Sequence, residues 1–128
     1  MQINLDPIVY EPGVTSLTDK HKDYLTKVSK ILQERPEMNI KLCGVAAGSD
    51  QDHLLLQANT GDDGKPVAKD KLKTTIADEQ LLALAEQRAD IIEALLVDQH
   101  SVKANRLISC RARIDNNTSS EPRVELSI

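Results

Sequence analysis

The apolar residues of this chain recur at helical spacing in two long segments. The clearest pattern predicts a helix over about residues 77 to 98. At about 100° per residue, one stripe of this helix collects Leu81, Leu84, Ala85, Ile91, Ile92 and Leu95. A second helix follows Thr18, whose side chain can cap the first turn, and it ends at Arg35 because the residue before a proline disfavours the α region. Residues 50–58 predict a third, shorter helix.

Four other segments alternate apolar and polar residues as strands do: 3–10, 39–46, 106–114 and 123–128. Pro7 favours an edge or a bulge in the first of them. The second turns to small residues after Leu42, which suits a place where another backbone or a ligand comes close. The polar, turn-rich run from Asn59 predicts an irregular insertion over about residues 59–76.

The strands and the two long helices follow one another in the order β-α-β-α-β-β. Strand–helix–strand crossovers place strands parallel through right-handed connections, and the loop over 115–122 lets the last strand return antiparallel. We therefore expect an α/β fold, a two-layer α+β sandwich with a mixed four-stranded sheet and its helices on one face. A chain of 128 residues is long enough for one core, so the prediction is a single domain over 1–128.

Arg88 lies near the middle of the apolar stripe of the long helix. A buried guanidinium without a partner costs several kcal/mol, so a charged group, a sheet edge or a ligand must meet it. An ion pair with Glu11, Asp50 or the C-terminal strand would hold helix to sheet. The alternative is a ligand carboxylate bound by the planar guanidinium.

Composition excludes several kinds of partner. The chain has 16 basic and 20 acidic residues, a net charge of −4 and no basic run that could follow a phosphate backbone, so nucleic acid is not expected. Tyr10 and Tyr24 are its only aromatic residues, which leaves almost no stacking surface for sugars or bases. No apolar run approaches the roughly 20 residues of a membrane span, and the first residues lack the pattern of a secretory signal.

No catalytic or metal motif emerges from the sequence. Nucleophile elbows, phosphate loops and dinucleotide fingerprints are missing, so we expect no enzyme and no cofactor. His53 follows two aspartates, but no second ligand group lies at suitable spacing. His21 and His100 are both far from His53 in the sequence. Residues 61–64 lack the alternating oxygen ligands and closing glutamate of a calcium loop. These residues are therefore read as polar surface, and no metal is expected.

Several segments together carry a family resemblance. They are Ile8-Val9-Tyr10-Glu11-Pro12-Gly13 leading to Leu17, Ile40-Lys41-Leu42-Cys43-Gly44, Leu84-Ala85-Glu86-Gln87-Arg88-Ala89 and Pro122-Arg123-Val124-Glu125-Leu126. With the element order, they make nearly the whole chain similar to the OmpA-like domain. The resemblance implies a sheet ordered first, fourth, second, third strand, a periplasmic location, and binding of peptidoglycan through the diaminopimelate unit of its stem peptide.

The binding residues that the resemblance implies are only partly present. Where the family has Gly-His-Thr-Asp after the second strand, this chain has Gly44-Val45-Ala46-Ala47, so Ala47 replaces the carboxylate. In the family motif Asn-x-x-Leu-Ser-x-x-Arg-Ala, Arg88 is kept. Recognition of a zwitterionic ligand needs both charges, and Asp50, three residues after Ala47, is the possible stand-in.

The resemblance is closer to the OmpA-like tail of large AsmA-type envelope proteins of unassigned function. It implies an excised C-terminal module, associated with the outer membrane, whose partner is the parent polypeptide or another envelope protein. The leading hypothesis is a non-enzymatic periplasmic module with a degenerate peptidoglycan pocket and a structural or protein-interaction role. The alternative is a functional peptidoglycan anchor that uses Arg88 and Asp50.

Cys43 and Cys110 are the two cysteines of the chain, and the resemblance makes their strands neighbours. An oxidising periplasm allows a disulfide between them, whereas two small buried thiols are the other interpretation. No Cys-x-x-Cys motif is present, so redox catalysis is not expected.

Overall fold

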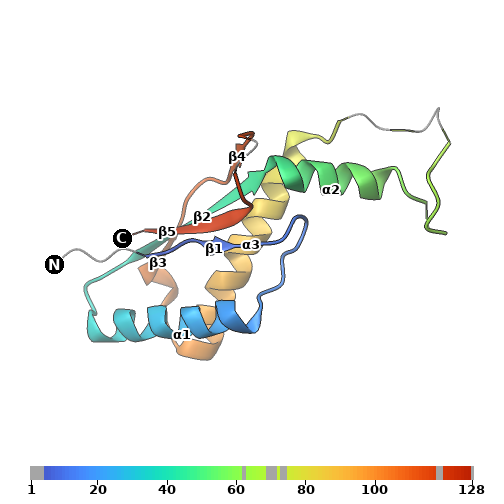
Figure 1. Cartoon of the computed structure of the whole chain (residues 1–128). Coiled ribbons are helices and arrows are strands. Elements are labelled where there is room, and N and C mark those ends of the chain that lie inside the picture. Colours follow the sequence, from blue (N-terminus) through green and yellow to red (C-terminus); the bar gives the residue numbers. More distant parts are fainter. Residues whose placement is uncertain (1–4, 62, 69–71, 73–74, 118–119, 128) are drawn as a thin grey trace.

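In the computed structural model, helices and a mixed β-sheet form two layers (Figure 1). The structure describes residues 5–61, 63–68, 72, 75–117 and 120–127. In these residues the elements follow in the order β1 (Ile8–Val9), α1 (Asp19–Glu34), β2 (Ile40–Ala47), α2 (Gly48–Ala58), α3 (Asp78–His100), the 3-10 turn η2 (Ala104–Arg106), β3 (Leu107–Ser109), β4 (Arg113–Asp115) and β5 (Arg123–Ser127). The predicted α/β class is confirmed.

β2 is the central strand of the sheet. The strand order is β1-β5-β2-β3, and β4 also pairs with β2. β3 and β4 run parallel to β2, whereas β5 is antiparallel to both β2 and β1. This is the predicted order, first, fourth, second, third, once β3 and β4 are counted as the third predicted strand.

The third predicted strand is divided by a bulge, which makes the sheet five-stranded rather than four-stranded. Leu42 is opposite Ser109, and Val45 is opposite Arg113. Between these pairs, two residues of β2 face the three residues 110–112. One extra residue in one strand is the definition of a β-bulge, and it shifts the register by one position. The alternation seen in the sequence therefore does not continue through one unbroken strand.

The first predicted strand is also shorter than expected. Within the described residues only Ile8–Val9 form β1, and predicted residues 3 and 4 lie outside the described part. Tyr10 still donates its backbone N–H to the carbonyl of Pro122 at 2.9 Å. The last predicted residue, Ile128, also lies outside the described part.

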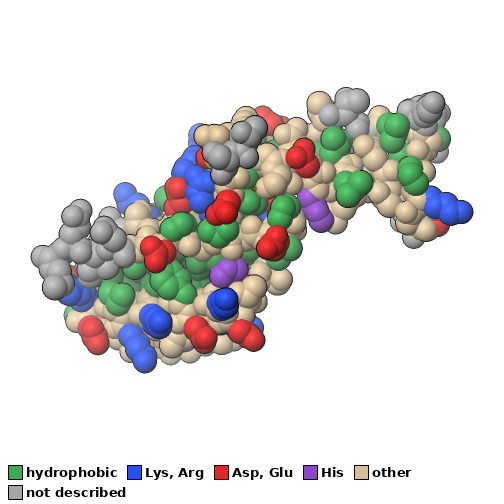
Figure 2. All heavy atoms as spheres, in the orientation of Figure 1, with side chains coloured by type: hydrophobic (Ala, Val, Ile, Leu, Met, Phe, Trp, Pro, Cys, Tyr) green, Lys and Arg blue, Asp and Glu red, His purple; other side chains and the backbone are tan. Residues whose placement is uncertain are grey.

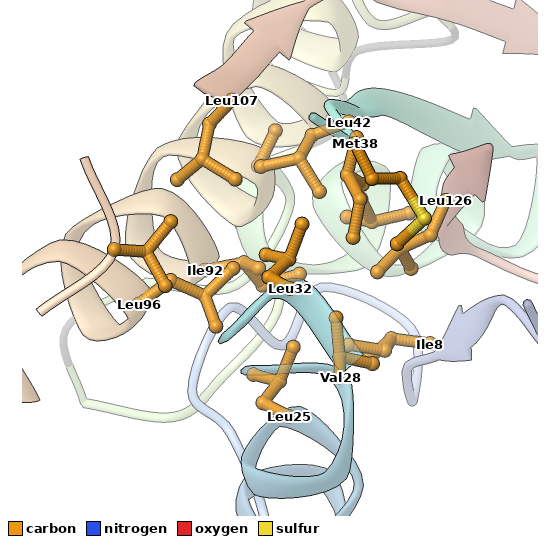
Figure 3. Close-up of a cluster of buried hydrophobic side chains, with 14 of the residues drawn as sticks. Ile8, Leu25, Val28, Leu32, Met38, Leu42, Ile92, Leu96, Leu107 and Leu126 are labelled. Atoms are coloured by element: carbon orange, nitrogen blue, oxygen red, sulfur yellow. The ribbon is translucent and has the colours of Figure 1, made fainter. Parts of the chain in front are cut away.

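The main core lies between the sheet and helices α1 and α3, where the labelled side chains point toward one another (Figure 3). α1 is capped as predicted, because the Thr18 hydroxyl accepts from the backbone N–H of His21 and the His21 side chain accepts from that of Thr18. The core side chains from the helices are Leu25, Val28, Leu32, Ala89, Ile92 and Leu96, and those from the sheet are Ile8, Ile40, Leu42, Leu107, Val124 and Leu126.

Small residues let α3 pack closely on β2. A Cβ added at Gly44 would collide with the backbone carbonyl of Ala85 in α3. The sequence indicated that some backbone or ligand comes close here, and the structure identifies it as the backbone of α3. Because α3 lies this near the strand, the next turn of the helix brings Arg88 close to the end of β2.

α2 continues from the end of β2 and projects away from the two layers (Figure 1). The expectation that helices cover one face therefore holds for α1 and α3 but not for the outer part of α2. Figure 2 shows hydrophobic side chains at the surface of this projection, and Leu56 is 67% exposed. Beyond α2, the described residues of 59–76 form no helix or strand, only an isolated bridge between Thr60 and Pro66. No helix in the described part is long and apolar enough to cross a membrane.

Candidate functional site

A buried ion pair between Arg88 and Asp50 forms the centre of the candidate site. Nη1 of Arg88 donates to Oδ2 of Asp50 at 2.8 Å, and Nη2 donates to Oδ1 at 2.7 Å. Both side chains are 0% exposed. Two parallel charge-assisted hydrogen bonds give this pair the strongest geometry available to an arginine and a carboxylate.

Asp50 is positioned by the start of α2. It is the third residue of the helix, and its Oδ2 accepts the backbone N–H of Ala47, the N-cap residue, at 3.1 Å. Its Oδ1 accepts the backbone N–H of Gly13 at 2.7 Å. Each carboxylate oxygen therefore accepts one bond from Arg88 and one from the backbone. These four bonds use the hydrogen-bonding capacity of the carboxylate.

Arg88 also holds the loop that connects β1 to α1. Its Nε donates to the carbonyl of Val14 at 2.7 Å, and its guanidinium carbon lies 5.0 Å from the centre of the Tyr10 ring. The ring gives the cation a favourable face where water is excluded. Gly13, next to Val14, has φ +73°, and a Cβ there would collide with the His53 ring. A glycine at this turn therefore lets the loop close over the pair.

The surroundings of the pair favour its charged form. Burial alone raises the pKa of Asp50, but hydrogen bonds from Arg88 and from the backbone of Gly13 and Ala47 outweigh it, so the pKa lies below its ordinary value of 3.8. Burial also raises the pKa of Tyr10, against the opposing charge of Arg88. Both effects keep Asp50 ionised and Tyr10 neutral at neutral pH.

We expect the protein to lose stability in acid because of Asp50. Its folded-state pKa lies below that of the unfolded chain, so its contribution is complete above that ordinary value and is lost as the pH falls through the folded-state pKa. Urea unfolding measured between neutral pH and about pH 2.5 will show the decline.

A double variant isolates the contribution of Asp50. Asp115 and Glu125 are the other carboxyls with a lowered pKa in the described part of the chain. The variant Asp115→Asn/Glu125→Gln removes them and should keep a clear decline below pH 4, the region set by the ordinary pKa of Asp. A flat profile in this variant would contradict the assignment to Asp50.

All three binding residues expected from the sequence meet at this site. Arg88 and Asp50 contribute side chains, and Ala47 contributes its backbone N–H. Of the three ion-pair partners considered for Arg88, the structure selects Asp50. Sequence reasoning missed the contacts of Gly13 and Val14. The one local signal for this turn was Gly13 itself, because a glycine can adopt the positive φ that it has here.

The guanidinium of Arg88 is bonded within the protein and shielded from solvent. Three of its N–H groups are bonded to protein acceptors, and no atom of the side chain reaches solvent. Withdrawal of Asp50 from the guanidinium would leave the buried backbone N–H of Ala47 and the partly buried N–H of Gly13 without acceptors. In this structure the anion that Arg88 binds is the carboxylate of Asp50 itself.

The two cysteines lie at the bulge of the sheet. The structure joins Cys43 of β2 to Cys110, the residue after β3, by a disulfide with Cα atoms 4.8 Å apart. Cys110 therefore lies where the third predicted strand is interrupted. Its backbone N–H donates to the carbonyl of Leu42 at 3.1 Å, so the bulge is held both covalently and by the sheet.

The other candidate groups do not converge. Within the described ranges, no three His, Cys, Asp or Glu side chains cluster as metal ligands do. His21 caps α1, and His53 packs beside Gly13. Of the glycine-rich turn considered for calcium, Asp62 lies outside the described residues.

No protein-family model matches the chain, and no curated protein matches it. Solved structures do match. The C-terminal domain of Helicobacter pylori MotB is 20% identical, with 97% of this chain and 84% of that chain covered and a TM-score of 0.61. The OmpA-like domain of FopA1 from Francisella tularensis subsp. tularensis SCHU S4 is 15% identical, with 95% and 69% covered and a TM-score of 0.63.

A third solved structure, the peptidoglycan-associated lipoprotein from Burkholderia pseudomallei, is 17% identical, with 94% of this chain and 86% of that chain covered and a TM-score of 0.58. At such identities the likeness concerns the fold. The strand order and the two helices packed on one face agree with it. The chain therefore has the OmpA-like fold.

Proposed function

We propose that this chain is a non-enzymatic module of the bacterial cell envelope whose peptidoglycan pocket is closed, and that it has a structural or protein-interaction role. The observation that carries the proposal is the buried, bidentate Arg88–Asp50 pair. An arginine available to a diaminopimelate carboxylate would need free donors and access to solvent, and Arg88 has no access to solvent.

A periplasmic location as part of a larger envelope protein belongs to the same proposal. The support is twofold. The OmpA-like fold is shared with a peptidoglycan-associated lipoprotein, and a disulfide joins Cys43 to Cys110, as oxidising compartments allow. The AsmA-type parent inferred from the sequence segments extends this proposal and rests on the resemblance alone.

A functional peptidoglycan anchor is the second candidate. It is favoured by one observation: a cation and an anion, the two charges that a zwitterionic ligand needs, lie together at the end of β2. In such an anchor the stem peptide would separate Asp50 from Arg88 and bind one charge with each. The penalty is large, because a buried pair must open before any ligand contact forms.

A titration with a diaminopimelate-containing muropeptide decides between the two candidates. For a closed pocket we expect no saturable NMR shifts at Gly13, Ala47, Asp50 or Arg88 up to millimolar ligand. The Burkholderia peptidoglycan-associated lipoprotein is the positive control for the muropeptide preparation. Saturable shifts clustered on these residues would overturn the closed pocket.

Two variants establish whether any shifts depend on the site. Arg88→Ala should abolish them if the chain is an anchor. Arg111→Ala is the matched control, because Arg111 is exposed and forms no ion pair with the residues that the structure describes. Equal losses in both variants would indicate nonspecific attraction of the muropeptide to positive charge.

A further inference from the structure

A cavity lies at the opposite end of β2 from the Arg88–Asp50 pair. It has a volume of 480 Å³ and is lined by Pro36, Asn39, Ser101, Lys103, Asn105 and Arg106. Asn39 precedes the first residue of β2, whereas Ala47 of the candidate site is its last. The two sites are therefore separated by the length of the central strand.

Arg106 is held rigidly at the wall of this cavity. Its Nε donates to the carbonyl of Met38 at 3.1 Å, and its Nη2 donates to the carbonyls of Leu32, Arg35 and Met38 at 2.8, 2.6 and 2.8 Å. Leu32 lies in the last turn of α1, Arg35 is the C-cap residue of that helix, and Met38 lies in the loop that leads to β2. The guanidinium is thus fixed before any ligand arrives, so little conformational entropy is lost when it binds one.

Several polar groups that line the cavity have no hydrogen-bond partner in the described part of the protein. Nη1 of Arg106 has no acceptor in the described part of the protein. The side chains of Asn39, Lys103 and Asn105 also have no hydrogen-bond or ion-pair partner there, and all three are exposed. Two cations and two amides therefore present unused donors to one cavity.

The charge of the cavity differs from that of the whole molecule. The chain carries a net charge of −4, yet the lining contains a lysine and an arginine and no acidic residue. Nearby carboxylates exist in the sequence, such as Glu37, but they do not line the cavity. Such a lining favours an anion over a cation or an apolar group.

We propose that this cavity binds a phosphate group through Lys103, Arg106 Nη1 and the amides of Asn39 and Asn105. A tetrahedral phosphate offers several acceptor oxygens in different directions, which suits donors that come from four separate residues. A carboxylate offers a planar pair of oxygens that suits a single guanidinium with both outer nitrogens free, and here Nη2 is already used. The volume leaves room for part of the molecule that carries the phosphate.

An NMR titration of the protein with inorganic phosphate tests this proposal. Ionic strength is held constant with chloride, so that screening does not change. We expect saturable amide shifts over residues 101–106 and at Asn39, with no change at Asp50 or Arg88. No saturable shift at tens of millimolar phosphate would overturn the proposal, and so would equal affinity for acetate.

The double variant Lys103→Ala/Asn105→Ala removes two exposed donors and leaves the Arg106 contacts to α1 in place. It should bind phosphate roughly tenfold or more weakly, as expected for the loss of a charge-assisted hydrogen bond. The control is Lys27→Ala, which removes an exposed lysine of α1 that does not line the cavity. An equal loss in the control would overturn a specific site.

The phosphate could be a soluble ion or ester, or the headgroup of a phospholipid. Co-sedimentation with vesicles of phosphatidylglycerol, compared with vesicles of phosphatidylcholine alone, distinguishes these sources. Binding to the anionic vesicles that is lost in the double variant but kept in the lysine control assigns the site to a lipid headgroup. Phosphate binding in solution without vesicle binding assigns it to a soluble phosphate compound.

Discussion

Replacing Asp50 with alanine will lower the free energy of unfolding by about 3 to 5 kcal/mol, because the Arg88 guanidinium then stays buried without its charge partner. The same change leaves the backbone N–H groups of Gly13 and Ala47 without acceptors, which adds to the loss. Urea unfolding at neutral pH measures the effect, provided that the denaturant slope is unchanged.

A double-mutant cycle separates the ion pair from the rest of the site. Arg88→Met alone leaves a buried carboxylate without its guanidinium, and it should also destabilise the protein strongly. The double variant Asp50→Ala/Arg88→Met removes both charges and should be more stable than the sum of the two single effects predicts, by about 1 to 3 kcal/mol. Additive changes in the free energy of unfolding would show that the two charges do not interact.

The surface pair of Arg113 and Glu125 is the matched control. Its atoms approach to 2.8 Å, a distance like that of the buried pair, but its side chains are 51% and 37% exposed. Arg113→Ala, which removes this ion pair and leaves that of Glu125 with Arg123 in place, should change the free energy of unfolding by at most about 1 kcal/mol, because solvent screens such pairs. If this control lost as much free energy of unfolding as Asp50→Ala, burial of the ion pair would not explain the large effect of Asp50→Ala.

Reducing the bond between Cys43 and Cys110 will destabilise the protein by about 4 kcal/mol. The two cysteines are 67 positions apart in the sequence, so the cross-link removes the entropy of a long loop from the unfolded chain. Urea unfolding with and without a phosphine reductant measures the difference. The denatured protein, prepared without reductant, should contain no free thiol.

The control for this experiment is the variant Cys43→Ala/Cys110→Ala. It should unfold like the reduced protein and should not respond to the reductant. If the unmodified protein also fails to respond, or if it contains two free thiols before reduction, the disulfide does not form in solution and the bulge is held by the sheet alone.

The elements of this fold could be predicted because their signals are local. α1 begins directly after its threonine cap and ends at Glu34, with Arg35, the residue before Pro36, as its C-cap. This agrees with the expectation to within one residue, because capping and the restriction before proline act over a few residues. α3 was expected over about 77–98 and spans Asp78–His100. Its buried face is shifted slightly, since Leu84, Ile91 and Leu95 are only partly buried and Leu96 is fully buried.

The bulge between β3 and β4 could not be predicted in the same way. The residues from Arg106 to Ile114 show an alternating pattern that is compatible with one strand. The extra residue becomes visible only when the register with β2 is known. Pairing between segments that are more than sixty residues apart has no local signal, so the position of the interruption depends on the assembled sheet.

The sequence by itself determined that Arg88 lies on a buried helix face and needs a partner, because periodicity and the cost of burying a charge are properties of the local chain. Only the tertiary structure decided which partner it has. Thirty-eight positions separate Arg88 from Asp50, and Glu11 and the last strand were equally compatible with the sequence. The close packing of α3 on Gly44 and the start of α2 bring Asp50 to the guanidinium, and the loop at Gly13 closes over both.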